Sequence, residues 1–232
     1  MNGRLKVLGI VLTVFGLAFM AGGAYAFVRT QDGAKSLQAF SEAQGVKLAY
    51  NDQGQLTDRG EVAGAQAIMS LLTNDWGYKV DTNELNPNDP LVNTASEYMF
   101  QMATIAHHTL DSTQTVVLDK DVTAADGTVY KAGTYEFAVD GRYFSQFNRA
   151  NPIEGKARDQ AWSGTGLALI SNLGVGTATA TALQLGFGIA GLFAGIGIFA
   201  LIAGFGLVWV AQTLKEPAPK AAFEPKVTPI PA

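Results

Sequence analysis

Residues 7–28 have the sequence VLGIVLTVFGLAFMAGGAYAFV, which contains no charged side chain. A second uncharged run, LGFGIAGLFAGIGIFALIAGFGLVWVA, occupies residues 185–211. An α-helix needs about 20 consecutive apolar residues to cross the hydrocarbon core of a bilayer. The sequence therefore predicts a membrane protein in which two transmembrane helices flank about 155 residues of mixed, water-soluble sequence, a length typical of one domain.

Six regions are predicted along the chain. They are a cytoplasmic N-terminus (1–6), a transmembrane helix (7–28), an exported α+β domain (29–155), a juxtamembrane helical segment (156–184), a second transmembrane helix (185–211) and a cytoplasmic Pro/Ala-rich tail (212–232).

The charges beside the apolar runs predict the orientation. Basic residues outnumber acidic ones in the short ends, whereas the segment between the runs holds 11 basic and 18 acidic residues. Because basic flanks remain in the cytoplasm, we expect a plasma-membrane protein with both termini inside and the central domain outside. The first run ends in Ala24-Tyr25-Ala26, so cleavage as a signal peptide stays an open alternative.

Composition excludes several function classes. The chain has no cysteine, which rules out disulfides, thiolate metal sites and iron–sulfur clusters. Neither apolar run holds Asp, Glu, Lys, Arg or His, which argues against a channel, a pump or haem ligation inside the bilayer. The acidic domain would repel nucleic acid. We expect no cofactor.

The exported domain is predicted to be α+β, with three or four helices and a small antiparallel β meander. Helices are expected over 33–44, 61–72 and 91–110, and strands over 46–50, 55–57, 115–118, 128–130 and 134–139. The first two strands are expected to pair across the turn-rich residues 51–54, and Trp76 and Tyr78 to pack against the core. Asp126-Gly127 and Asp140-Gly141 are dipeptides that close hairpins. On the helix over 91–110 the expected buried face comprises Tyr98, Met99, Met102, Ile105, Ala106 and Thr109. The expected solvated face comprises Glu97, Gln101, Thr104, His108 and Asp111.

His107 and His108 are the only histidines. With Asp111 they are the candidate metal ligands of the chain. Neighbouring helix residues point about 100° apart, so both histidines cannot face one metal without distortion. We favour a structural or surface role for them and predict no metal site, no catalytic residue and no enzymatic activity.

Seven glycines occur in the second apolar run. Small residues let membrane helices approach closely, so we predict helix packing at Gly188, Gly191 and Gly195, and at Gly16 in the first run. Two interpretations stay open. The runs pack on each other, or a glycine face is kept for helices of another subunit.

Aromatic residues cluster after the last predicted strand. Tyr143, Phe144, Phe147 and Trp162 are either core residues or a surface for a partner. The Pro-rich tail is either a passive end or a segment lying along the cytoplasmic surface of a neighbour.

Residues 103–113 (ATIAHHTLDST) and 181–188 (TALQLGFG), together with the order of parts, resemble a group of small actinobacterial two-span membrane proteins. Many of these carry the label aromatic ring-opening dioxygenase, which their sequences do not support. The resemblance implies the topology and an actinobacterial envelope, and it transfers no catalytic residue. Residues 115–139 depart from that group.

These observations predict a non-catalytic accessory subunit of a larger bacterial membrane complex, with a respiratory electron-transfer assembly as the leading candidate. The expected partners are other integral membrane subunits and the lipid bilayer. The alternative is a stand-alone envelope protein whose exported domain binds a lipid, peptide or cell-wall ligand. That alternative predicts a pocket near Trp76, Tyr78 and the aromatic residues at 143–147.

Overall fold

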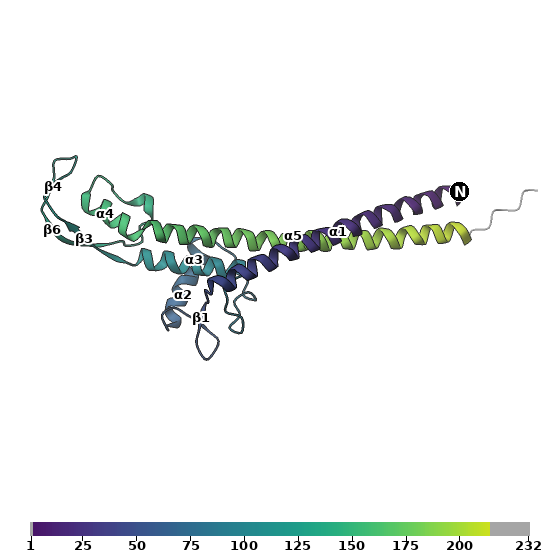
Figure 1. The fold of residues 1–232 in the computed structure, drawn as a ribbon, viewed down its shortest axis with the longest axis horizontal. Helices are drawn as coiled ribbons and strands as arrows, with labels where there is room; N and C mark the ends of the chain where they lie inside the picture. Colours follow the sequence, from purple (N-terminus) through teal and green to yellow (C-terminus); the bar gives the residue numbers. More distant parts are fainter. Residues whose placement is uncertain (1, 214–232) are drawn as a thin grey trace, which may run out of the picture. The chain divides into compact units, whose positions relative to one another are not determined.

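The computed structural model describes residues 2–213 and divides into two units. Residues 2–30 and 186–213 form what we call the helix pair, and residues 31–185 form the central domain. Figure 1 labels the α-helices and several of the strands, numbered in chain order. Residue 1 and residues 214–232 lie outside the described part, and with them most of the predicted tail.

Two long helices, α1 (Asn2–Gln44) and α5 (Gly164–Thr213), contain the apolar runs. Both are long and apolar enough to cross a membrane. The separate helix predicted over 33–44 is wrong, because α1 continues through it without a break. No proline interrupts this stretch, and a single helical glycine such as Gly33 costs only about 1 kcal/mol. The boundary predicted at 184/185 is likewise not a break, because α5 continues through it. The start of the segment predicted over 156–184 belongs to a separate helix, α4 (Pro152–Ala161).

Short strands β1 (Ala49–Tyr50) and β2 (Leu56–Thr57) pair antiparallel, as predicted. Asn51 holds the turn between them. Its side-chain oxygen accepts hydrogen bonds from the backbone N–H groups of Gln53 and Gln55, at 3.1 and 2.9 Å.

Helix α3 (Ala95–Leu110) follows α2 (Val62–Ser70) and the π-helical turn η1 (Leu71–Asp75). It begins at Ala95 rather than at 91, because Thr94 and Glu97 form a capping box. Its predicted faces need correction. Glu97, expected in solvent, is 1% exposed. Of the expected buried face only Tyr98 and Ala106 are buried; Met99, Met102, Ile105 and Thr109 are half-buried, and Phe100, Ala103 and Leu110 are buried instead.

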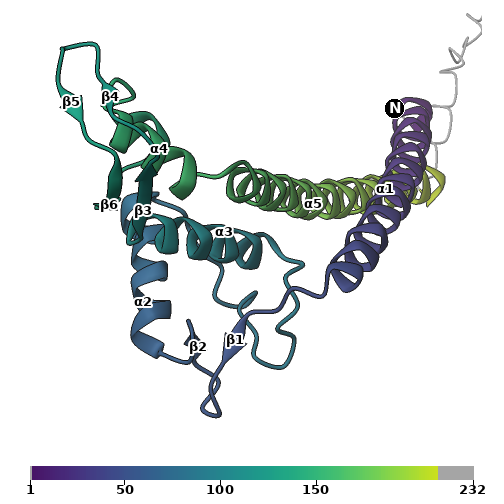
Figure 2. The same cartoon turned by 60° about the vertical axis from the view of Figure 1, so that its left-hand side comes forward.

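Strand β3 (Thr113–Leu118) pairs with β6 (Gly133–Ala138), and β4 (Val122–Thr123) pairs with β5 (Val129–Tyr130). The predicted meander is therefore wrong, since the four strands form one long interrupted hairpin (Figure 2). Gly127 lies in the turn at its tip, as predicted. Asp140 and Gly141 close no hairpin. With φ of 50° and 72°, they return the chain to α3, where the Gly141 N–H donates to the Leu110 carbonyl.

Buried residues of α2, η1 and α3 form the main core of the central domain. Ile68, Leu72 and Ala103 have no solvent exposure there. Trp76 and Tyr78 pack against this core, as predicted. Helix α4 packs on the β3–β6 hairpin, where Val116 and Ala157 are fully buried.

Candidate functional site

One face of the α5 part of the helix pair contacts α1 through glycine. A methyl group placed at Gly16 would lie 2.9 Å from the Gly197 carbonyl oxygen, and one at Gly9 would lie 2.7 Å from that of Gly204. Both distances are too short for a real carbon, so the two backbones touch. We call Ala190, Gly197, Gly204 and Ala211 the contact face of α5, because all four are buried.

The opposite side of α5 also carries glycines. At Gly188, Gly191, Gly195 and Gly206, none of the described residues comes within 4 Å of where a Cβ would stand, the neighbouring turns aside. Gly188 and Gly197 are nine residues apart, which places them about 180° apart around the helix. We call these four residues the open glycine face.

The predicted packing residues therefore fall into two groups. Gly16 lies in the α1–α5 contact, whereas Gly188, Gly191 and Gly195 lie on the open glycine face. Gly9 and Gly204 also form this contact but were not among the predicted packing residues. The missed signal is a spacing of seven residues, in Gly9, Gly16 and Gly23 on α1 and in Ala190, Gly197, Gly204 and Ala211 on α5. Seven-residue spacing keeps small residues on one seam between two wrapped helices.

The two histidines are held by different carboxylates. His108 Nε2 lies 2.9 Å from Asp58 Oδ1, which ties α3 to the turn before α2. His107 Nε2 lies 3.4 Å from Asp111 Oδ2, one helical turn on. In the described residues no three His, Asp or Glu side chains converge as metal ligands. The histidines therefore form two separate histidine–carboxylate pairs. His107, His108 and Asp111 do not surround a common position that a metal ion could occupy.

The four aromatic candidates separate into core and surface. Phe147 and Trp162 are buried, and the Trp162 indole N–H donates to the Arg142 carbonyl at 3.0 Å. Tyr143 and Phe144 remain partly exposed. Tyr143 stacks on Trp162 with ring centroids 5.7 Å apart, and its hydroxyl accepts from the Trp76 indole N–H at 2.8 Å.

Phe144 is also contacted by two arginines. The guanidinium carbons of Arg158 and Arg149 lie 4.8 and 5.6 Å from the centre of its ring, within the range of cation–π attraction. The exposed part of the aromatic cluster is therefore basic, although the domain around it is acidic. Asp159 accepts from Arg158 and offsets part of this charge.

Glu97 is a buried carboxyl group of the central domain. Its Oε2 accepts from the Asn93 N–H, the Thr94 N–H and the Thr94 hydroxyl, at 3.0, 2.9 and 2.8 Å. Burial raises the pKa of Glu97 above its ordinary value, and these hydrogen bonds only partly oppose the rise. Burial, and then the charge of Glu97, raise the pKa of Tyr50 as well. The group caps α3 and does not line the cavity described below, so we assign it a structural role.

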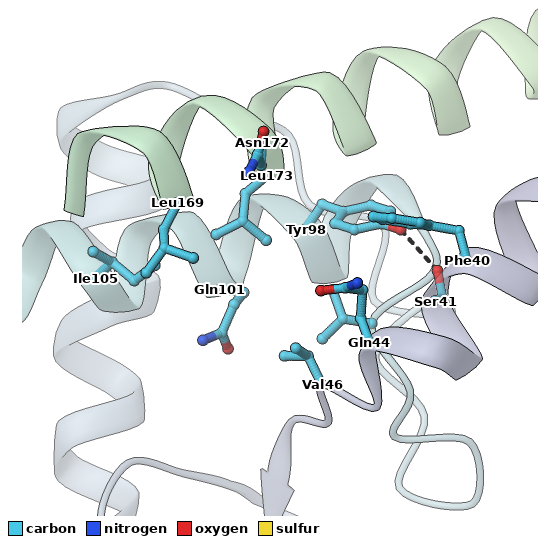
Figure 3. Close-up of a pocket in the computed structure, with 11 residues that line it drawn as sticks. Phe40, Ser41, Gln44, Val46, Tyr98, Gln101, Ile105, Leu169, Asn172 and Leu173 are labelled. Atoms are coloured by element: carbon cyan, nitrogen blue, oxygen red, sulfur yellow. Dashed lines mark hydrogen bonds between the residues drawn. The ribbon is translucent and has the colours of Figure 1, made fainter. Parts of the chain in front are cut away.

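A cavity of about 320 Å³ opens in the central domain between the end of α1, the middle of α3 and the start of α5 (Figure 3). It is lined by Phe40, Ser41, Gln44, Val46, Val92, Tyr98, Gln101, Ile105, Leu169, Asn172 and Leu173. None of Trp76, Tyr78 and residues 143–147 lines it, so this cavity is not at the place where the sequence predicted a pocket. Its residues come from three distant stretches of chain, which no local pattern connects.

Comparison of the chain with protein-family models, curated proteins and solved structures finds no match.

Proposed function

We propose that this protein is a non-catalytic accessory subunit of a larger bacterial membrane complex. In this proposal the helix pair spans the plasma membrane, and the open glycine face of α5 packs on a helix of another integral membrane subunit. The central domain is exported and both termini are cytoplasmic, since the short ends are basic and the domain is acidic.

The surface of the helix pair supports a bilayer location. Large apolar side chains point outward along both helices, among them Phe15, Phe199 and Ile202, and Phe199 is 74% exposed. Water-soluble proteins rarely expose apolar patches of this extent. Hydrocarbon chains of lipid would cover them, while the helical backbone satisfies its own hydrogen bonds.

The observation that carries the proposal is the pair of opposite glycine faces on α5. Apolar burial does not drive helix association in a bilayer, so close backbone contact must supply the attraction. The contact face already provides this for α1. The open glycine face offers the same close approach to a second helix, and the described residues leave it uncovered.

A respiratory electron-transfer assembly is our candidate for the larger complex. It is supported by the resemblance of residues 103–113 and 181–188 to small actinobacterial two-span proteins, and by no individual site residue. The partner is therefore to be identified by experiment.

The test is purification of the tagged full chain from native membranes in mild detergent, with mass spectrometry and a visible absorption spectrum. The proposal predicts a stoichiometric multisubunit complex for the unchanged chain. Gly191→Ile places a branched side chain on the open glycine face and should remove the partners. Ile189→Phe adds bulk to a side chain on the same helix that is already exposed and off this face, and should retain them.

Two other outcomes would overturn the proposal. A complex containing only a second copy of the chain would mean that the open glycine face makes a homodimer. Recovery of the chain alone would favour a stand-alone envelope binding protein, the alternative that the cavity in the central domain supports.

A further inference from the structure

The cavity in the central domain has walls fixed by internal packing. The Ser41 and Tyr98 side chains, both buried, share a hydrogen bond of 2.8 Å (Figure 3). The Tyr98 ring also packs on Gly176 of α5, where a Cβ would lie 2.7 Å from it. These contacts hold α1, α3 and α5 around the cavity, so the space is formed before any ligand enters.

Most of the wall is apolar and carries no full charge. Leu169 and Leu173 of α5 face Ile105 and Tyr98 of α3 across the space, with Phe40 at the α1 end (Figure 3). None of the described Asp, Glu, Lys, Arg or His residues lines it. The cavity is open on one side, where Phe40 and Leu169 are exposed, and its wall offers no counter-charge to a charged group that enters.

Three carboxamides supply the polar part of the wall, from Gln44, Gln101 and Asn172. Gln44 and Asn172 are exposed at the mouth of the cavity and Gln101 is half-buried, and none of the three makes a side-chain hydrogen bond to another described residue, whereas the Ser41 and Tyr98 hydroxyls bond each other. Each carboxamide offers both a donor and an acceptor. The cavity can therefore pair with a neutral group that donates or accepts hydrogen bonds, such as a hydroxyl or a carbonyl.

The volume indicates the size of the ligand. A protein cavity of 150 Å³ binds benzene, so 320 Å³ has room for roughly a dozen non-hydrogen atoms. Ligand sites begin at about 300 Å³ and combine apolar walls with a few polar groups. We infer that this cavity binds a single hydrocarbon chain that ends in an uncharged hydroxyl or carbonyl group, held by the carboxamides.

This inference is independent of the proposed subunit contact, since the site lies within the central domain. The probe that tests it is decan-1-ol carrying a diazirine on its chain, added to membranes that contain the full-length protein. After illumination, the labelled residues are mapped by mass spectrometry. Labelling of residues 185–211, which would meet the probe in the lipid, provides an internal reference in every sample.

The expected result is labelling within 40–46, 98–105 or 169–173 that unlabelled decanol displaces at low concentration. Decanoate and decyltrimethylammonium should compete at least tenfold less well, because each is charged. Leu169→Trp fills the cavity and should abolish this labelling, while Val175→Trp, at an exposed position of the same helix, should leave it unchanged. Gln101→Leu keeps the cavity open and should weaken competition by decanol several-fold.

Labelling confined to the reference segment would overturn the inference. Labelling of the cavity segments that no competitor displaces would also overturn it. The same holds if the Leu169→Trp and Val175→Trp variants are labelled equally in these segments. Equal competition by decanol and its charged analogues would show that the site does not select an uncharged end group.

Discussion

The helix pair and the central domain achieve close packing in opposite ways. In the helix pair, backbones meet where side chains are absent, as at Gly16 and Gly197. In the central domain, large side chains such as Ile68 fill the interior, and caps such as Thr94 satisfy the helix ends. The difference matches the proposed locations, with the central domain in water and the helix pair in lipid. Burial of apolar surface stabilises a domain in water, whereas helices in lipid gain only from close contact and hydrogen bonding.

The largest expected effect is in the central domain, where Ile68 is fully buried. Ile68→Ala should lower the free energy of unfolding by about 2–5 kcal/mol, because it removes apolar contacts and leaves a cavity. Val129→Ala, at a half-exposed strand position, should change it by less than about 0.5 kcal/mol. Urea unfolding of the full chain in lipid nanodiscs, followed by tryptophan fluorescence, measures both. Equal effects would contradict the assigned core.

The contact between α1 and α5 should be weakened by larger side chains at its glycines, rather than by smaller side chains elsewhere. Gly16→Leu forces a side chain against the Gly197 carbonyl and should separate the helices, at a cost of about 1–3 kcal/mol. The Phe19 and Phe193 rings meet edge to face with centroids 5.4 Å apart, so cysteines at these positions report the contact in a chain that has no other cysteine.

A short thiol cross-linker should join Phe19→Cys and Phe193→Cys in the unchanged background, and at least tenfold less in the Gly16→Leu background. Gly195→Leu is the matched control, since its side chain would point into open space. Loss of the cross-link in this control would show that the two glycine faces are not distinct.

The cap of α3 should have a smaller effect. Thr94→Ala removes the acceptor for the Glu97 N–H and a donor to the Glu97 carboxylate, and should lower the free energy of unfolding by about 0.5–2 kcal/mol. Thr94→Ser keeps the hydroxyl and should retain most of that stability. The same urea series measures both variants, and an equal loss in the two would mean that the hydroxyl does not cap the helix.

Glu97 gives the smallest and most specific prediction. Its pKa is raised in the folded protein by burial, so folding favours the protonated carboxyl. The stabilisation that the protonated carboxyl gives to the folded state is fully present below the ordinary glutamate pKa of 4.5. It is lost as the pH rises through the higher pKa of the folded protein. Unfolding midpoints between pH 4 and 8 should fall with pH more in the unchanged chain than in Glu97→Gln. Parallel curves would contradict the assigned burial.

Local signals in the sequence predicted the two apolar helices, the turn at Asn51 and the hairpin tip at Gly127. These features depend on a few neighbouring residues, so their pattern is visible without the fold. The Thr94–Glu97 capping box was equally visible and was missed, which placed the helix start four residues early and put Glu97 in solvent.

Other features depend on distant residues. The pairing of β3 with β6 joins Thr113 to Ala138, and the turn at Asp126-Gly127 does not determine which outer strands meet. The partners of each glycine are likewise set by the register of α1 against α5. The seven-residue spacing of Gly9, Gly16 and Gly23 indicates a seam, but only the structure shows that Gly191 and Gly195 lie opposite it.

The central claim is that α5 packs on α1 with one glycine face and on a partner with the opposite one. It is most directly tested by placing a large side chain on each face in turn and comparing the two variants. Gly195→Ile and Gly197→Ile differ by two positions on α5, and each is assayed for the Phe19–Phe193 cross-link and for co-purifying subunits. The account predicts that Gly197→Ile loses the cross-link, whereas Gly195→Ile keeps it and loses the partners. Full recovery of stoichiometric partners with Gly195→Ile would contradict the account.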